Sequence, residues 1–542
     1  MDLFKKHKNA ILIGIIIIFL IIRIITIFTS HKHVEGDRAF TGIVAKHIIE
    51  KNIYPFYLYE EHYSGNQTIL AYLLVIPFLL FGITSFSILL VDIILALVFL
   101  LVTYVVVNKI FSKKIALITS LLLAIPIPVQ LFLDVEGGAY TISLLFNVVL
   151  LYLFYQLFYH KKSKLKNFAL FGFVAAIAYY SSEFVLPLLI VCLIFWFIFD
   201  KTFYLTKKFF VFLISFIAGA MPIIIYNITN NFANIKQFLA GTIIHRFACS
   251  HNLFPKTVQF GSRIVDPCRI FSETSPSTFK TVFSKTFLKF FGYTDIAWIY
   301  YIIFVLSFIL LAYLLRKEIK NLFLGLIPSK KFDMPPEKIK KELFIVAFIF
   351  IFIILFLISG FSAEDHLAPI IPFVQIMIAL LFARLANKKL NFLAYFLVIS
   401  IIVISSYEDF NFISQPNRED MSDVVLFLKE NNIKYVYAPF FPKWKIIFGT
   451  NEEVIASCQD LCPCGYNYPP YEKMVADSNT TTYIFDRGAK LNSMLTESLK
   501  KQSIGYRAVE FKNQVVYQLE KPVKPNKIIA ECKDSDGWPG EY

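Results

Sequence analysis

The chain has 542 residues, of which 57% are hydrophobic and 17% aromatic, and its formal net charge is +14. A water-soluble core of this length does not need so many apolar residues, so the composition excludes an ordinary soluble protein and predicts several membrane crossings. The positive charge does not indicate a nucleic-acid partner, because the lysines and arginines gather in short links between apolar runs, where they report topology.

Apolar runs long enough, or nearly long enough, to cross a membrane continue up to residue 407. They cover residues 10–28, 67–82, 85–107, 115–133, 139–159, 167–183, 184–199, 209–228, 296–315, 343–360, 367–384 and 390–407. The run at 67–82 is short and contains Pro77. As a helix it would reach about 24 Å, against a hydrocarbon core of about 30 Å.

The distribution of Lys and Arg decides whether residues 67–82 are predicted to cross the membrane or to lie along its surface. If residues 67–82 lie along the membrane surface, every short basic link falls on one side, and the links DVEGG and FSAEDH, which have neither Lys nor Arg, fall on the other. We therefore predict a polytopic α-helical membrane protein with about eleven transmembrane helices and one juxtamembrane helix. Its amino terminus is expected in the cytoplasm, and the long loops 29–84 and 229–295 are expected outside.

Residues 408–542 are predicted to form a small extracytoplasmic α/β domain that follows the transmembrane domain of residues 1–407. Hydrophobic spacing predicts helices at 418–433, 442–450 and 490–503, strands at 434–440, 452–458 and 480–486, and a hairpin at 506–520. No glycine-rich loop follows a strand, so a nucleotide site is not expected. The domain is expected to act as a lid or as an acceptor-binding module.

An even number of cysteines falls outside the membrane in this topology, as paired thiols require, whereas Cys192 lies in a span. A metal site at CQDLCPC is the alternative, although its spacing fits no common zinc pattern well. The disulfide candidates are Cys249, Cys268, Cys458, Cys462, Cys464 and Cys532.

Acidic residues collect at the outer face of this topology. Glu35 and Asp37 follow the first span, and Asp134 and Glu136 follow the third, where two glycines can end the helix and let both carboxylates converge. Grouped carboxylates either raise each other's pKa, which makes a general base, or bind a divalent cation such as Mg²⁺ or Mn²⁺. Solvated loop acids with no function remain the alternative for each of them.

The residues from EGDRAF at 35–40 through FGITSF at 81–86 resemble the first outer loop of membrane glycosyltransferases with the GT-C fold. The resemblance is to the family 39-like group, which includes dolichyl-phosphate-mannose protein mannosyltransferases and aminoarabinose transferases of lipid A. It continues through DVEGGAY at 134–140 and DHLAPIIP at 365–372. The motifs are loose individually, but their order and spacing match over roughly the whole chain.

This resemblance implies that the protein transfers a sugar, with inversion, from a polyprenyl-phosphate-linked donor to an acceptor at the outer membrane face. The acceptor, whether protein, lipid or cell-envelope glycan, stays open. Asp37 corresponds to the proposed general base, and Asp134 with Glu136 to the acids that support it or hold a metal with it.

Substrate-binding residues are expected around these acids. Where relatives often have Arg-Tyr, this chain has Asp365 and His366, so the cation for the carrier phosphate is sought in the loop 229–295. The substrate-binding candidates are Glu35, Tyr63, Asn66, His245, Arg246, Arg263 and His366. For Tyr63 and Asn66 an ordinary turn is an equal alternative. An arginine in so long an outer loop is more often a solvated charge or a structural partner.

Two other classes of function compete with an enzyme. A lipid or sugar transporter or flippase would keep ionisable residues at mid-membrane and often shows repeated halves, whereas the acids here gather at one boundary and no internal repeat is found. A non-catalytic envelope-assembly subunit with a degenerate site is the third class. All three would be integral to the membrane, in contact with its lipids.

Overall fold

A computed structural model gives the structure of the chain. It describes all residues except 1–7, 30–33, 60, 63–64, 136, 160–163, 201, 237–257, 261–262, 266–281, 326–338, 360–363, 415–419, 460, 462–463, 465–466 and 529–542. Contacts divide the chain into two compact units. The first comprises Met1–Thr29, Asp92–Ile235 and Ser277–Gln415, and the second comprises Ser30–Val91, Lys236–Pro276 and Pro416–Tyr542.

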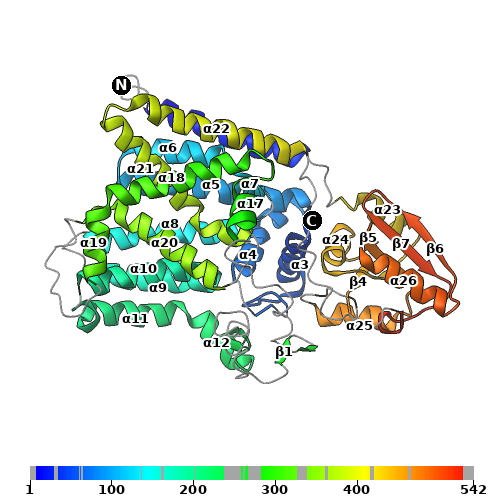
Figure 1. The fold of residues 1–542 in the computed structure, drawn as a ribbon. Coiled ribbons are helices and arrows are strands. Elements are labelled where there is room, and N and C mark those ends of the chain that lie inside the picture. The colour runs from blue at the N-terminus through cyan, green and yellow to red at the C-terminus, as the bar shows by residue number, and fades with distance from the viewer. Residues whose placement is uncertain are drawn as a thin grey trace. The chain divides into compact units, whose positions relative to one another are not determined.

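The first unit is built from helices that pack side by side (Figure 1). Its α-helices are α2 (Lys8–Thr29), α5 (Ser85–Ile110, from Asp92 onward), α6 (Lys113–Ala124), α7 (Pro128–Val135), α8 (Gly138–Tyr159), α9 (Leu165–Ser181), α10 (Leu186–Phe199), α11 (Lys207–Gly219), α12 (Met221–Thr229), α17 (Phe287–Phe291), α18 (Ala297–Leu314), α19 (Arg316–Gly325), α20 (Glu342–Ser359), α21 (Ile371–Asn387) and α22 (Asn391–Ser414). Short 3₁₀ or π segments are η1 (Glu183–Val185), η2 (Phe203–Leu205), η3 (Val282–Thr286) and η5 (Glu364–Ile370).

Many of these helices are apolar enough to cross a bilayer. In the described part of the chain, 6 helices have the length and composition of a span, and the number rises to 8 if each of two bent helix pairs counts as one span. Four shorter apolar helices are Gly65–Phe81, Leu165–Ser181, Glu183–Phe199 and Glu342–Ile358. The chain is an integral membrane protein with many spans, in agreement with the composition.

Two runs that were predicted as continuous spans are broken by proline. The run 115–133 divides into α6 and α7 with a bend of 77°, and the run 209–228 divides into α11 and α12 with a bend of 52°. Pro126 and Pro128 lie at the first break and Pro222 at the second. Proline has no N–H to donate and its ring clashes with the preceding turn, so a helix ends or kinks there.

Aromatic side chains fill the core of the first unit. Phe154 on α8 packs against Trp196 on α10 and Phe344 on α20, with ring centroids 5.2 Å and 4.7 Å away. Between α9 and α11 the backbones come much closer, because a Cβ at Gly172 would lie 2.2 Å from the carbonyl oxygen of Phe212. Small residues at such crossings are the usual means by which membrane helices pack closely.

The second unit combines helices with a mixed sheet. Its elements are α3 (Gly36–Lys51), α4 (Gly65–Phe81), the first residues of α5, β1 (Val258–Phe260), β2 (Arg263–Val265), α23 (Ser422–Glu430), β3 (Tyr435–Tyr437), α24 (Phe440–Gly449), β4 (Ile455–Ser457), α25 (Pro469–Asp477), β5 (Thr482–Asp486), α26 (Lys490–Lys501), β6 (Tyr506–Glu510), β7 (Gln514–Leu519) and α27 (Pro525–Ile528). Every helix and strand predicted after residue 417 is present, and α25 and α27 are additional helices.

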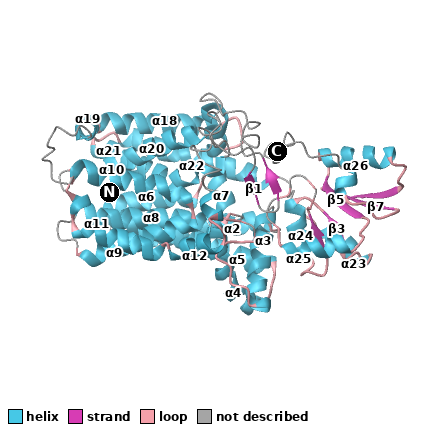
Figure 2. Cartoon of the chain, turned by 90° about the horizontal axis from the view of Figure 1, so that it is seen from below, coloured by secondary structure: helices cyan, strands magenta, loops and turns pink. Residues whose placement is uncertain are grey.

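The sheet has the strand order β4-β3-β5-β7-β6. β3 runs parallel to β4 and β5, whereas β7 is antiparallel to both β5 and β6, with Val509 opposite Val516 in the predicted hairpin. Figure 2 shows this group of strands in magenta, away from the small antiparallel pair β1–β2. The carboxyl-terminal α/β domain is thus confirmed as a fold.

The doubtful apolar run at 67–82 forms α4, which belongs to the second unit and packs on α3. One side of α4 is buried, including Leu70, Ala71 and Leu74, each 0% exposed. Leu79 and Leu80 on another side are 67% and 69% exposed. An apolar helix with one face left uncovered suits the predicted position at a membrane surface.

Candidate active site

The predicted base, Asp37, lies in the first turn of α3. Glu35 is the N-cap of this helix, and its side chain accepts a hydrogen bond from the backbone N–H of Asp37 at 2.8 Å. A carboxylate at this position satisfies a helix donor and complements the positive end of the helix dipole. Asp37 itself is half-buried. The two acids after the first span are therefore neighbours in one turn, which Glu35 caps.

The backbone around Asp37 is closely packed against α24 of the carboxyl-terminal domain. A Cβ at Gly36 would lie 2.8 Å from the backbone Cα of Phe441, so only glycine allows this approach. One turn further along α3, the ring of Phe40 stacks on the indole of Trp444 with centroids 4.2 Å apart. These contacts hold the start of α3, which carries Asp37, against α24.

The start of α4 is joined to the same turn of α3. The hydroxyl of Thr41 donates to the backbone carbonyl of Asp37 at 2.9 Å and lies 3.4 Å from the side-chain oxygen of Gln67. Asn66, a predicted substrate residue, is 5% exposed, and its Oδ1 accepts from the N–H of Gln67 at 2.8 Å. The structure thus brings Glu35, Asp37 and Asn66 into one packed region.

Arg38 is a cation that the sequence analysis passed over. It follows Asp37 directly, and its side chain is only 4% exposed. A buried arginine is uncommon and is retained where it pairs with an anion. The cation for a carrier phosphate was sought in the distant loop 229–295, although EGDRAF already contains one beside the predicted base.

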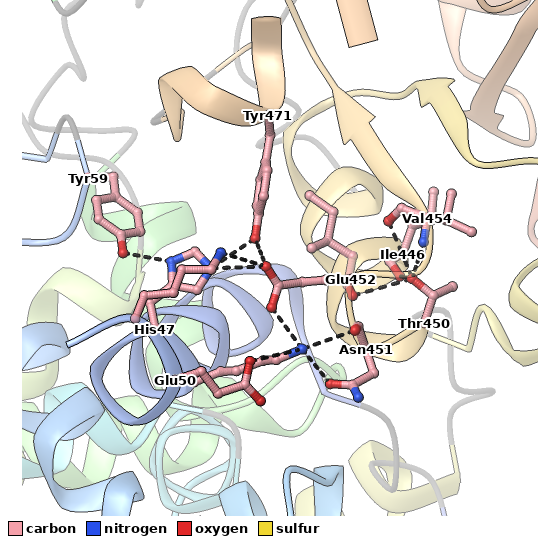
Figure 3. Close-up of polar contacts among 12 residues, drawn as sticks. His47, Glu50, Tyr59, Ile446, Thr450, Asn451, Glu452, Val454 and Tyr471 are labelled. Atoms are coloured by element: carbon pink, nitrogen blue, oxygen red, sulfur yellow. Dashed lines mark hydrogen bonds and ion pairs between the residues drawn. The ribbon is translucent and has the colours of Figure 1, made fainter. Parts of the chain in front are cut away.

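A second polar cluster lies at the other end of α3 (Figure 3). Lys46 Nζ lies 2.7 Å from Glu452 Oε2, and Lys51 Nζ lies 3.0 Å from Glu452 Oε1. His47 Nε2 lies 3.1 Å from Glu452 Oε1 and 2.8 Å from the hydroxyl of Tyr471, which also donates to Glu452. One carboxylate after α24 therefore contacts three side chains of α3.

This cluster shifts the titration of its members. Burial by itself would raise the pKa of Glu452, but hydrogen bonds from His47 and the three other partners outweigh it and hold the pKa well below the usual range. Burial and the neighbouring Glu452 raise the pKa of Tyr471. Burial, then Tyr468 and Glu452, raise the pKa of Tyr59, whose hydroxyl lies 2.7 Å from His47 Nδ1.

Asp134 lies in the first unit, at the end of α7, and is fully buried. The guanidinium of Arg23 on α2 donates to it through Nε at 3.1 Å and also through Nη2. Arg23 further donates to the backbone carbonyls of Ala124 at 2.6 Å and Leu123 at 3.0 Å, and lies over the ring of Phe19. Asp134 is therefore one half of a buried ion pair that ties α2 to the break between α6 and α7.

The predicted helix break at the two glycines is confirmed, since α7 ends at Val135 and α8 begins at Gly138. Glu136, which lies between them, is outside the described residues. Its convergence with Asp134 stays a prediction.

His366 also lies in the first unit, in η5, next to aromatic and acidic side chains. Its ring is 5.4 Å from that of Phe184, which stacks on Tyr140. The hydroxyl of Tyr140 donates to Asp365 at 3.0 Å. Aromatic faces beside carboxylates and hydroxyls are suited to holding a polyhydroxylated ligand, so His366 keeps its predicted role as a candidate.

Several predicted residues are not placed by the structure. Tyr63, His245, Arg246, Cys249, Cys268, Cys462 and Cys532 are outside the described residues, and of Arg263 only the backbone, in β2, is described. Cys458 and Cys464 form a disulfide, so the expected pairing holds for this pair. Cys192 is buried with a free thiol, as its place in a span predicted.

The described part of the chain contains no group of three His, Cys, Asp or Glu side chains close enough to hold a metal ion. Of the three predicted ligands, Asp134 is paired with Arg23, whose fixed positive charge would repel a cation. The His, Cys, Asp and Glu side chains of the described residues are therefore poorly arranged to bind a metal ion.

Known proteins resemble this chain in part of its sequence and in its fold. Residues 68–226 match the family model described as dolichyl-phosphate-mannose-protein mannosyltransferase. No curated protein matches the chain significantly. ArnT from Cupriavidus metallidurans in the apo state has a TM-score of 0.55 at 10% identity, covering 94% of this chain and 98% of that one.

Two further solved structures agree with this result. ArnT of the same organism bound to undecaprenyl phosphate has a TM-score of 0.54 at 10% identity, over 93% of this chain and 97% of that one. The Archaeoglobus fulgidus oligosaccharyltransferase in complex with Zn and sulfate has a TM-score of 0.51 at 12% identity, over 92% and 73%. The chain therefore has the GT-C fold of membrane glycosyltransferases, and its residues 68–226 carry the sequence pattern of the dolichyl-phosphate-mannose-protein mannosyltransferase family.

Proposed function

We propose that this protein transfers a sugar from a polyprenyl-phosphate-linked donor to an acceptor at the outer membrane face, with inversion. The observation that carries the proposal is the match in fold to ArnT over nearly the whole of both chains, including a structure of ArnT bound to undecaprenyl phosphate. The mannosyltransferase sequence pattern at 68–226 and the packed turn that presents Asp37 support it.

Asp37 is the general base in this proposal. An acceptor oxygen attacks the anomeric carbon from the side opposite the phosphate, and its proton passes to the Asp37 carboxylate. The bond between the anomeric carbon and the phosphate oxygen breaks, and the polyprenyl phosphate leaves with the electron pair. The configuration at the anomeric carbon is inverted because attack and departure are on opposite sides.

The leaving phosphate needs a cation or donors beside it. Arg38 supports the proposal as the buried cation next to the base, and His366 and the loop residues His245, Arg246 and Arg263 remain the further candidates. No step of the transfer as proposed requires a metal. The earlier expectation of Mg²⁺ or Mn²⁺ is tested by assaying transfer after treatment with EDTA and again after adding back each ion.

The proposal is tested with Asp37→Asn in membranes of a strain that lacks the native protein. Tritiated undecaprenyl-phosphate-mannose and undecaprenyl-phosphate-aminoarabinose serve as donors, with the membrane glycolipids and proteins as acceptors. Loss of a general base is expected to lower turnover by ~10²- to 10⁴-fold while the protein remains inserted. A transporter or an assembly subunit would show no sugar transfer in the wild type, which would overturn the proposal.

A further inference from the structure

The helix that begins at Asp37 is held at its far end by a residue of the carboxyl-terminal domain. Glu452 lies in the loop between α24 and β4, and its contacts are with residues at the last two turns of α3. His47 is ten positions after Asp37, which corresponds to about 15 Å along a helix. The contacts of Glu452 are therefore remote from the proposed base and act on the helix that carries it.

The cluster is dense and largely shielded from water. The side chains of Lys46 and His47 are 5% and 0% exposed, and that of Glu452 is 14% exposed. Lys46 Nζ also donates to the backbone and side-chain oxygens of Asn451 at 3.0 Å and 2.7 Å. In the ion pair of Lys46 and Glu452, each charge thus has more than one polar partner, which a buried ion pair requires.

Both ring nitrogens of the histidine in this cluster have polar neighbours. Nε2 of His47 has three polar neighbours, with Lys51 Nζ at 2.7 Å, the hydroxyl of Tyr471 at 2.8 Å and Glu452 Oε1 at 3.1 Å. Nδ1, on the other side of the ring, lies 2.7 Å from the hydroxyl of Tyr59. Figure 3 shows the imidazole of His47 between the hydroxyl of Tyr59 on one side and the hydroxyl of Tyr471 and the carboxylate of Glu452 on the other.

Hydrogen bonds and ion pairs fix the rotation and the axial position of a helix, which apolar packing leaves adjustable. The stack of Phe40 on Trp444 and the approach of Gly36 to Phe441 press α3 against α24, but apolar surfaces tolerate sliding and rotation. Glu452 engages Lys46 through one oxygen and His47 and Lys51 through the other, so it specifies the rotation of α3 about its axis. The rotation of α3 decides where the carboxylate of Asp37 points.

We infer that Glu452 is a positioning residue for sugar transfer, which acts by holding α3, and hence Asp37, through Lys46, His47 and Lys51. The inference rests on the proposed function, because it takes Asp37 to be the base. It assigns to the carboxyl-terminal domain a part in forming the active site.

The test compares Glu452→Gln with Glu453→Gln in the full-length protein. The control removes the same charge one residue away, from a side chain that is 64% exposed and pairs only with Lys429 in the described part of the chain. With undecaprenyl-phosphate-mannose and undecaprenyl-phosphate-aminoarabinose as donors, Glu452→Gln is expected to lower kcat by ~10- to 100-fold, because a small misplacement of a reacting group costs this much. KM is expected to change less than about 2-fold, and Glu453→Gln is expected to match the wild type.

Hydrogen exchange separates positioning from general destabilisation. In Glu452→Gln, amides of residues 36–51 are expected to exchange faster, whereas those of β5 and β7 are expected to stay as protected as in the wild type. Tyr471→Phe, which removes one hydroxyl from the cluster and keeps the ring, is expected to give the same pattern with a smaller loss of kcat.

The measurements distinguish failure of the positioning role of Glu452 from failure of the proposed function. If Asp37→Asn is inactive but Glu452→Gln keeps the wild-type kcat, the positioning role is wrong and the proposed function stands. If Glu452→Gln loosens β5 and β7 as well, its effect is loss of folding and the positioning role is also wrong. If Asp37→Asn keeps the wild-type turnover, the proposed base is wrong, and the inference falls with it.

Discussion

Arg23 on α2 and Asp134 on α7 form an ion pair in which both side chains are 0% exposed. Arg23 also binds the last carbonyls of α6, so a single guanidinium joins three helices at the point where the chain bends by 77°. Asp134, expected to be an active-site acid, thus has a defined structural partner in the first unit.

Replacing Arg23 by Met is expected to destabilise the protein by about 3 to 5 kcal/mol, because it leaves the carboxylate of Asp134 buried without its cation. The change is measured as the loss in the midpoint of thermal unfolding in detergent. Combining it with Asp134→Leu is expected to recover much of the loss, since the pair is then replaced by apolar side chains. The exposed pair Arg487–Glu510 is the control, and Arg487→Met is expected to cost less than about 1 kcal/mol.

The disulfide Cys458–Cys464 closes a loop with a sequence separation of 6. Replacing both cysteines by Ala is expected to lower the free energy of unfolding by about 2 kcal/mol, the chain-entropy value for so short a loop. Alkylation of the unfolded protein without reductant is expected to modify Cys192 and to leave Cys458 and Cys464 unmodified. Labelling of both before reduction would show that the pair does not form.

Elements that depend on local sequence were predictable. The hairpin 506–520 reads as two alternating segments around a short turn, and Gly137 and Gly138 mark the end of α7, because each signal lies within a few residues of the element it specifies. The two helix breaks were also readable, from Pro126 and Pro222, but the apolar runs around them were long enough to suggest single spans.

Pairings between distant residues were not predictable from one sequence. His47 and Glu452 are 405 residues apart, and Arg23 and Asp134 are 111 apart, so no spacing rule joins them. A signal did exist for Arg23, because an arginine within an apolar run is costly and implies a buried partner. Residues 36–51 lie in the expected outer loop 29–84, where Lys46, His47 and Lys51 carry no signal that points to a distant partner.

The depressed pKa of Glu452 makes part of the stability depend on pH. A carboxyl whose folded pKa is lowered contributes stability that is fully present above its ordinary pKa of 4.5 and is lost as the pH falls through the folded value. The difference in unfolding midpoint between the wild type and Glu452→Gln is therefore expected to be constant above about pH 5 and to shrink below that. A difference that grows on acidification would contradict this linkage, and Glu453→Gln is expected to show little dependence.

The exposed face of α4 is expected to lie in the membrane interface. Spin labels at Ile76, Leu79 and Leu80, which are 63%, 67% and 69% exposed, should be relaxed by oxygen, which partitions into lipid, more than by a water-soluble nickel chelate. A label at Tyr506, 42% exposed on β6, serves as the aqueous control. If the α4 labels respond as Tyr506 does, α4 faces water and covers no lipid.

The direction in which the chain crosses the membrane is a prediction from the basic links and can be measured directly. Asn108 and Lys512 are both exposed, the first near the end of α5 and the second in the turn between β6 and β7. With an impermeant maleimide on intact cells, Lys512→Cys is expected to react, whereas Asn108→Cys should react only after the membrane is opened. Maleimide labelling of the native cysteines is measured in the protein without either substitution and gives the background. Basic links favour the cytoplasm, so reaction of Asn108→Cys from outside would contradict the predicted topology. Asp37 would then not lie on the side of the membrane where the proposed transfer occurs.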